Sequence, residues 1–330
     1  MKQILNRLIN KETLSTLEAK SILIDISNQK FNDIQLVSFL TVFLMRQLTV
    51  DEFVGFREAL LELSLKVDFG DVETIDLVGT GGDGKDSFNI STLSSFVVAG
   101  AGYKVTKHGN YGSSSVSGSS NVLEQLGYKF TNDVDLLKRQ LDKASIAFLH
   151  APLFHPALKA VGPVRKQLGL RTIFNLLGPV VNPSKPKHQL LGVYSKEIGE
   201  LYSEMLKSVN VNYSIVHSTD GYDEISLTTD FDLFSEGKYN LVTPESIGFS
   251  KIAQSEIYGG KTIESAAKIF IDILDGSGTD AQNNVVLANS AYAIKTISGK
   301  SLEESLELAK SSLFGGGAKG ALEKLVSIIE

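Results

Sequence analysis

The sequence predicts an α/β protein that begins with a smaller all-helical unit. Residues 1 to about 67 show only the apolar spacing of helices. From about residue 72, short apolar runs alternate with helical segments, which indicates a mostly parallel sheet covered by helices on both faces. A chain of 330 residues is long enough for two domains. We therefore expect a helical domain over residues 1–70 and an α/β domain over residues 71–330.

The helical unit carries start signals but no sign of catalysis. Ser15 with Glu18, and Thr49 with Glu52, have the spacing of capping boxes at helix N-termini. Apolar residues follow helical spacing through 36–44. We expect these broad apolar faces to pack internally or against a second copy of the chain.

The α/β region divides into short strands and longer helices. Residues 225–258 look irregular with some β content. We expect strands near 75–78, 103–107, 146–149, 189–194 and 213–217, and helices near 91–101, 118–126, 133–143, 155–168, 196–208, 263–274, 280–298, 301–313 and 318–328.

Composition excludes several classes of function. The formal net charge of −6 argues against binding to nucleic acid or to an anionic membrane. The chain has no cysteine, hence no thiolate metal site or cysteine nucleophile. The N-terminus lacks the apolar core of a signal peptide, and the apolar segment 36–45 is too short to span a bilayer. We expect a cytoplasmic protein.

A glycine-rich loop follows the first expected strand. Gly79–Gly84 is followed by Asn89 and Ser91, which can cap the next helix. A strand, a glycine loop and a helix N-terminus together bind phosphate groups, because backbone N–H groups can approach the anion.

The sequence around the glycine loop does not fit a dinucleotide-binding site. The loop fits G-x-G-x-x-G, but the acidic residue expected about twenty positions later is missing. Lys107 and His108 stand there instead, and no acidic residue occurs between Asp86 and Glu124. The Walker A pattern is also absent. The region suits a larger anion.

Two more segments follow expected strand ends. Residues 107–115 form a second loop rich in glycine and serine, which is either a phosphate loop or an ordinary surface loop. Asp223 and Glu224 follow the last parallel strand. Alone they would indicate a solvated turn, but at the phosphate-binding edge they are a plausible Mg²⁺ site, with a hydroxyl such as that of Ser91 completing it.

Four motifs resemble the anthranilate phosphoribosyltransferase family. They occur in the family's order, and the resemblance covers essentially the whole chain. They are GTGGD (79–83) with FNIST (88–92), KHGN (107–110) with SGSS (117–120), RKQLGLRTIFNLLGPVVNP (165–183), and DGYDE (220–224).

The resemblance implies a reaction and its participants. The amine of anthranilate displaces pyrophosphate from C1 of 5-phosphoribosyl 1-pyrophosphate, with no protein nucleophile and with Mg²⁺, two ions in each subunit, as cofactor. Ser91, Asp223 and Glu224 are the implied metal ligands. Gly79, Asn110 and Arg165 are the implied anthranilate contacts. The implied ligands of phosphoribosyl pyrophosphate are Gly79, Gly82, Asp83, Ser87, Asn89, Ile90, Ser91, Thr92, Lys107, His108, Gly109, Asn110, Tyr111, Gly112, Ser113, Ser114, Ser115 and Ser119.

The resemblance also implies an architecture of the nucleoside phosphorylase and phosphoribosyltransferase kind. A small helical domain, joined by helices from about 165–185, is hinged to the large α/β domain, and the protein is a homodimer. The second loop departs from the family pattern. Tyr111 stands where the family usually has arginine, Asn121 where it has aspartate, and Val116 often has a polar counterpart.

Two alternatives use the same fold. A pyrimidine-nucleoside phosphorylase would favour a KHS-type second loop and would not need Asp223 and Glu224. A non-enzymatic paralogue that binds nucleic acid would show a basic face and an eroded acidic pair. Asn110 and the intact DGYDE segment favour the transferase.

Overall fold

The computed structural model describes residues 1–112 and 116–328 of the chain. The chain divides into two compact units, one of residues 1–67 with 151–183 and one of residues 68–150 with 184–330. The helical unit is thus assembled from two separate segments of chain. The second segment begins at residue 151, earlier than the 165 expected from the sequence. In the described part of the chain, no helix combines the length and apolar character needed to cross a membrane.

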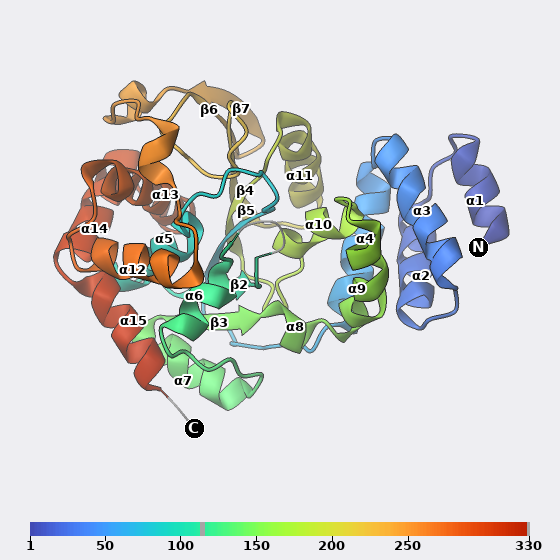
Figure 1. Ribbon diagram of the computed structural model, residues 1–330, viewed down its shortest axis with the longest axis horizontal. Coiled ribbons are helices and arrows are strands. Elements are labelled where there is room, and N and C mark those ends of the chain that lie inside the picture. Colours follow the sequence, from blue (N-terminus) through green and yellow to red (C-terminus); the bar gives the residue numbers. More distant parts are fainter. Residues whose placement is uncertain (113–115, 329–330) are drawn as a thin grey trace. The chain divides into compact units, whose positions relative to one another are not determined.

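The helical unit packs around an aromatic core. Phe39, Phe43 and Phe56 meet edge to face, with ring centroids 5.0–6.1 Å apart. The second segment closes this core, since the Arg57 guanidinium donates to the Val180 carbonyl at 2.8 Å. In Figure 1 the blue helices belong to the first segment and the yellow-green helices to the second. The unit contains α1 (Lys2–Ile9), α2 (Thr16–Ser27), α3 (Asp33–Met45), α4 (Val50–Leu63), α8 (Ala151–Phe154), α9 (Pro156–Leu168), α10 (Ile173–Leu177) and the 3₁₀ turn η1 (Gly178–Val180).

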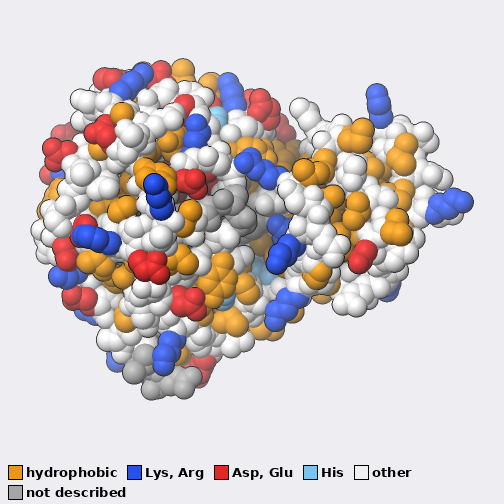
Figure 2. Space-filling model, viewed as in Figure 1, with side chains coloured by type: hydrophobic (Ala, Val, Ile, Leu, Met, Phe, Trp, Pro, Cys, Tyr) orange, Lys and Arg blue, Asp and Glu red, His pale blue; other side chains and the backbone are white. Residues whose placement is uncertain are grey.

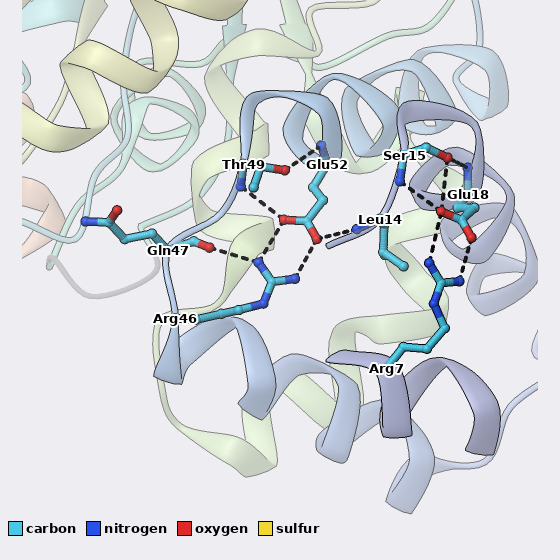
Figure 3. Close-up of polar contacts among 8 residues, drawn as sticks. All are labelled: Arg7, Leu14, Ser15, Glu18, Arg46, Gln47, Thr49 and Glu52. Atoms are coloured by element: carbon cyan, nitrogen blue, oxygen red, sulfur yellow. Dashed lines mark hydrogen bonds and ion pairs between the residues drawn. The ribbon is translucent and has the colours of Figure 1, made fainter. Parts of the chain in front are cut away.

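The two predicted capping boxes are present, and the second one has a further role (Figure 3). Glu52 is fully buried, and its carboxylate accepts the N–H groups of Thr49 at 3.0 Å and Leu14 at 2.9 Å. The Arg46 guanidinium donates two further hydrogen bonds to it, at 2.5 and 2.9 Å. One carboxylate therefore joins the end of α3, the start of α4 and the chain before α2. Glu18 makes the first capping box with Ser15 and also binds the Arg7 guanidinium, but at the surface.

The α/β unit is built on a sheet of strand order β3-β2-β1-β4-β5-β6-β7. The first five strands in chain order pair in parallel, which confirms the mostly parallel sheet. The order reverses between β1 and β4, because the chain extends the sheet in one direction to β3 and then in the other from β4. The strands are β1 (Ile75–Gly79), β2 (Val105–Gly109), β3 (Ile146–His150), β4 (His188–Gly192), β5 (Asn212–Ser218), β6 (Phe231–Ser235) and β7 (Lys238–Val242).

Helices cover this sheet in the way that parallel strands require. The buried α5 packs against α13 and α15, and α11 packs on β5 and β6 (Figure 1). The helices are α5 (Ile90–Gly100), α6 (Ser119–Gln125), α7 (Val134–Ala144), α11 (Lys196–Ser208), α12 (Ile263–Leu274), α13 (Asp280–Ser298), α14 (Leu302–Phe314) and α15 (Gly317–Ser327), with 3₁₀ turns η2 (Pro244–Ile247) and η3 (Gln254–Ile257).

The segment expected to be irregular contains an antiparallel hairpin. β6 pairs antiparallel with β5, and β7 pairs antiparallel with β6. The hairpin turn uses Glu236 and Gly237, both at positive φ. Tyr239 and Leu241 on β7 are 44% and 54% exposed, so the apolar side chains of this edge strand are not buried in a core.

Candidate active site

The site lies where the strand order of the sheet reverses. β1, β2 and β4 are neighbours, and they end at Gly79, Gly109 and Gly192 on the same edge. Ligands of open α/β sheets bind beyond the carboxyl ends of the strands at such a reversal. The first glycine loop leaves β1 at this point and leads into α5.

The first loop has a backbone that requires glycine. Gly81, Gly82 and Gly84 all have φ between 63° and 73°, a region that side chains other than glycine rarely adopt. The Asp83 carboxylate accepts the N–H of Lys85 at 3.1 Å, which closes a short turn. The loop therefore presents backbone N–H groups rather than side chains at the strand end.

Asp223 and Glu224 lie directly against this loop and the start of α5. The Asp223 carboxylate accepts the N–H of Gly81 at 2.6 Å, and the Glu224 carboxylate accepts the N–H of Ser91 at 3.1 Å. Asp223 is buried and Glu224 is partly exposed, so the solvated-turn interpretation of the pair is wrong. The structure brings Ser91, Asp223 and Glu224 together.

Glycines in two adjacent strands make room for the acidic pair. Gly79 and Gly192 face each other in the pairing of β1 with β4. A methyl group on Gly192 would lie 1.7 Å from the Asp223 carbonyl oxygen, and one on Gly79 would lie 2.3 Å from Asp223 Oδ2. The chain at Asp223 therefore passes over the two strand ends at a distance that only glycine permits.

The electrostatics of the pair suit a bound cation. Burial, together with the charge of Asp83, raises the pKa of Asp223 to about 7. Burial and the charge of Asp223 raise the pKa of Glu224 to about 8. Two neighbouring carboxylates with little access to water repel each other, and a divalent cation would relieve that cost.

The donor set here consists of oxygen atoms, as Mg²⁺ prefers. Within residues 1–112 and 116–328, no three or more His, Asp or Glu side chains gather as a complete metal site. The two carboxylates and the Ser91 hydroxyl fit Mg²⁺ on condition that the substrate and water supply the other ligands.

Lys107 lies in the buried part of β2. Its ammonium group donates to the carbonyl of Leu77 in β1 at 2.5 Å, and 2% of the residue is exposed. Burial lowers the pKa of Lys107, while the charges of Asp76 and Glu224 oppose that shift. In this conformation the ammonium group is a buried counter-charge to Glu224.

Hydrogen bonds join the second loop region to the N-terminus of α5 and to the N-terminus of α6. The Asn89 side chain donates to the carbonyl of Ser117 at 3.1 Å, which joins the α5 N-terminus to the second loop. Asn89 thus occupies the N-cap position of α5 without making the side-chain cap expected from the sequence. The Ser119 hydroxyl accepts the N–H of Asn110 at 3.2 Å.

The other predicted ligands of phosphoribosyl pyrophosphate lie on the same elements. Ser87 pairs with Tyr258 in an isolated bridge, and Ile90 and Thr92 are in the first turn of α5. His108 and Gly109 end β2, and Tyr111 and Gly112 follow. Ser113, Ser114 and Ser115 lie outside the described residues.

Arg165 belongs to the helical unit, in the last turn of α9. Its guanidinium donates to the Asn175 side chain at 3.4 Å and lies 5.5 Å from the centroid of the Phe174 ring. Burial lowers its pKa. Arg165, Phe174 and Asn175 all belong to the third motif (165–183). Contacts within this motif therefore hold the Arg165 side chain.

Sequence reasoning missed Gly192 and Asn121. Gly192 allows the backbone of Asp223 to approach, and the Asn121 side chain binds the backbone N–H groups of Gly112 and Gly118. Gly192 ends an apolar strand with a glycine, and Asn121 stands three residues after Gly118 at the start of α6. A strand-terminal glycine and an amide at the third helical position are the signals that could have identified them.

Known families match both units of the chain. Residues 71–319 match the glycosyl transferase family, a/b domain, and residues 2–64 match the glycosyl transferase family, helical bundle domain. An anthranilate phosphoribosyltransferase of Flavobacterium johnsoniae is 56% identical over 325 residues, which are 98% of each chain. The chain belongs to the anthranilate phosphoribosyltransferase family. A family member from Bacteroides fragilis is 52% identical over 99% of each chain.

Solved structures of the anthranilate phosphoribosyltransferase family share the fold. The enzyme of Thermus thermophilus aligns with a TM-score of 0.92 at 30% identity, over 98% of each chain. The Saccharomyces cerevisiae enzyme in complex with PRPP and Mg aligns with a TM-score of 0.91 at 27% identity, over 98% of this chain and 96% of that one. The predicted fold class and family are thus confirmed.

Proposed function

We propose that this chain transfers the phosphoribosyl group of 5-phosphoribosyl 1-pyrophosphate to the amine of anthranilate. The products are N-(5-phosphoribosyl)anthranilate and pyrophosphate, and the reaction belongs to tryptophan biosynthesis. Membership of the family and the similarity to the yeast enzyme in complex with PRPP and Mg support this proposal.

One observation of the molecule carries the proposal. The Asp223–Glu224 pair hydrogen-bonds to Gly81 of the first phosphate loop and to Ser91 of α5. A carboxylate pair held against a phosphate loop suits a substrate that brings pyrophosphate with a divalent cation.

Different residues of the chain bind different parts of the donor. Backbone N–H groups of the first loop and the N-terminus of α5 bind phosphate oxygens. Ser91, Asp223 and Glu224 would hold Mg²⁺, as two ions, and the buried Lys107 offsets the charge of Glu224. Bound Mg²⁺ supplies charge neutralisation for the departing pyrophosphate. The residues predicted from the resemblance, Asn110 and Ser119 among them, position the ribosyl group, so that catalysis consists of positioning and charge stabilisation.

Arg165 binds the carboxylate of anthranilate in this proposal. A guanidinium is suited to a carboxylate because two of its N–H groups can donate in parallel. The Arg165 guanidinium donates to a neutral amide, that of Asn175, at 3.4 Å and lies near Phe174. Gly79 and Asn110 supply the remaining predicted contacts with anthranilate. The aniline nitrogen attacks C1 of the donor while the bond from C1 to the pyrophosphate oxygen breaks, and the amine proton passes to water.

The fluorescence of anthranilate provides the test. We expect it to fall when phosphoribosyl pyrophosphate and Mg²⁺ are both present, and to remain when either is omitted. Phosphorolysis of uridine or thymidine without anthranilate turnover would instead indicate a pyrimidine-nucleoside phosphorylase. Nucleic-acid binding without either activity would indicate the non-enzymatic paralogue.

We also propose that two copies associate through the helical unit, in the cytoplasm. Hydrophobic side chains are spread over the helical unit in the view of Figure 2. Leu17, Ile34 and Met45 are 77%, 79% and 84% exposed, which is costly for large apolar side chains in a monomer. Light scattering should give a dimer mass, and Met45→Glu should give a monomer. Phe314→Glu, at an exposed position of the α/β unit, is the control and should leave the dimer intact.

A further inference from the structure

Asn121 joins the two ends of the segment 110–118, which continues the second glycine loop to the start of α6 and is here called the loop. Its side-chain carbonyl oxygen accepts the N–H of Gly112, at the start of the loop, and the N–H of Gly118, at its end. Both distances are 3.0 Å. An amide oxygen has two lone pairs, so this pair of hydrogen bonds uses its full accepting capacity.

The bond to Gly112 goes beyond ordinary helix capping. Gly118 is the N-cap of α6 and Asn121 is the third helical residue, so the Gly118 bond is the usual return bond of a capping box. Gly112 lies outside the helix, nine residues before Asn121. The same oxygen therefore fixes the loop entrance to the helix start.

Other contacts also hold the two ends of the loop close together. The N–H of Ser120 donates to the Asn110 carbonyl at 3.1 Å, and the Ser119 hydroxyl donates to the same carbonyl at 3.2 Å. A methyl group on Gly118 would lie 2.3 Å from the nitrogen of Gly112 and 2.5 Å from the carbonyl carbon of Tyr111. The two ends of the loop are thus in backbone contact, and Asn121 is the side chain that bridges them.

We propose that Asn121 is a positioning residue for the phosphoribosyl donor. This inference rests on the proposed function, because it assigns Asn110 and Gly112 to substrate binding. Asn121 acts on them only through the backbone: it holds the loop entrance in one place before the donor arrives. Binding then costs less ordering entropy than it would with an unfixed loop.

The aromatic side chain after Asn110 supports the same end of the loop. The Tyr111 ring meets the His150 ring edge to face, with centroids 4.9 Å apart, and its hydroxyl lies 3.4 Å from the Glu124 carboxylate. His150 in turn stacks on Phe130 at 4.2 Å. The Tyr111 side chain thus packs into this aromatic cluster, while the side chain of Asn121, together with Ser119 and Ser120, supplies polar links between the two ends.

Three variants test the inference. Asn121→Ala removes the shared acceptor, and two lost hydrogen bonds should weaken donor binding by about tenfold or more. Asn121→Asp keeps an acceptor oxygen and should restore binding to within about threefold of wild type. Gln282→Ala is the matched control, because Gln282 is also a third-position amide that accepts the N-cap N–H, that of Thr279 at 3.0 Å, in the same unit.

Calorimetry with phosphoribosyl pyrophosphate and Mg²⁺ measures donor binding, and steady-state kinetics measure each KM. We expect Asn121→Ala to raise the dissociation constant and the KM of the donor, with the KM of anthranilate nearly unchanged. Unchanged donor binding in Asn121→Ala, an equal loss in Gln282→Ala, or no rescue by Asn121→Asp would overturn the inference. Failure of the proposed function is distinguishable, because the wild-type chain would then not turn over anthranilate.

Discussion

Replacing Gly192 by alanine should disable the site while leaving the fold in place. The added methyl carbon would lie 1.7 Å from the carbonyl oxygen of Asp223 and 2.7 Å from its carbonyl carbon. A Cβ atom essentially never lies within 3.0 Å of a non-bonded heavy atom, so the chain at Asp223 must move until this separation reaches at least 3.0 Å. β4 is paired on both sides and has less freedom to move than the connection that carries Asp223.

The displacement translates into a loss of catalysis. Misplacing a catalytic group by about 1 Å costs on the order of 10²-fold in rate. We therefore expect kcat/KM of Gly192→Ala to fall by about 10²-fold. The Mg²⁺ concentration for half-maximal activity should also rise, because Asp223 is a proposed ligand. The hydrogen bond from Gly81 to Asp223 would be lost in the same movement.

The assay is anthranilate fluorescence over a range of Mg²⁺ concentrations, with circular dichroism as the check on folding. Gly320→Ala is the control, because a methyl group there meets no atom within 4 Å and the residue lies in α15 of the same unit. The control should keep full activity. A folded Gly192→Ala protein with at least half of the wild-type kcat/KM would refute the argument.

Three further predictions concern charged residues. The double variant Asp223→Asn with Glu224→Gln should lose Mg²⁺-dependent turnover yet remain folded, because the amide oxygens can still accept the N–H groups of Gly81 and Ser91; a variant that no longer folds would contradict this. Glu52→Gln should destabilise the helical unit by about 3 kcal/mol in urea unfolding, since it leaves Arg46 without its buried partner, whereas exposed Glu18→Gln should cost less than about 1 kcal/mol. Burial alone would raise the pKa of Glu52, but hydrogen bonds from Arg46, Thr49 and Leu14 outweigh it and lower the pKa below 4.5. The stabilisation is therefore complete above pH 4.5 and is lost as the pH falls through the lower folded value, a dependence that Glu52→Gln should lack. Arg165→Ala should raise the KM of anthranilate by about tenfold without changing that of the donor, and equal effects on both substrates, or the same effect in exposed Lys166→Ala, would mean that Arg165 is structural.

Much of the fold was predictable because its boundaries are marked by local chemistry. α12 and α13 begin and end where the sequence predicted, since Thr262 and Thr279 cap their N-termini and Gly299 ends α13 in the left-handed conformation. The β6–β7 hairpin was not predicted. Its turn places Glu236 rather than asparagine or aspartate at positive φ, so the common hairpin signal is missing.

The site was predictable where side chains supply the chemistry. Asp223 and Glu224 follow a strand, and their position at the phosphate loop followed from the sheet rule. The burial of Lys107 and the roles of Gly192 and Asn121 depend on which backbone atoms approach them. The sequence marks Gly192 as a strand-terminal glycine and Asn121 as an amide at the third helical position, but it does not show which distant backbone atoms these residues meet.

The two-segment construction of the helical unit has a consequence for synthesis on the ribosome. Arg57 reaches its partner Val180 across 123 positions of sequence, and α9 packs against α2, α3 and α4. The N-terminal helices therefore emerge long before the residues that complete their core. We expect a nascent chain ending near residue 70 to expose this apolar surface and to be sensitive to proteolysis until residue 183 has been translated. We therefore expect that residues 2–64, although they match a family of their own, do not fold stably without residues 151–183.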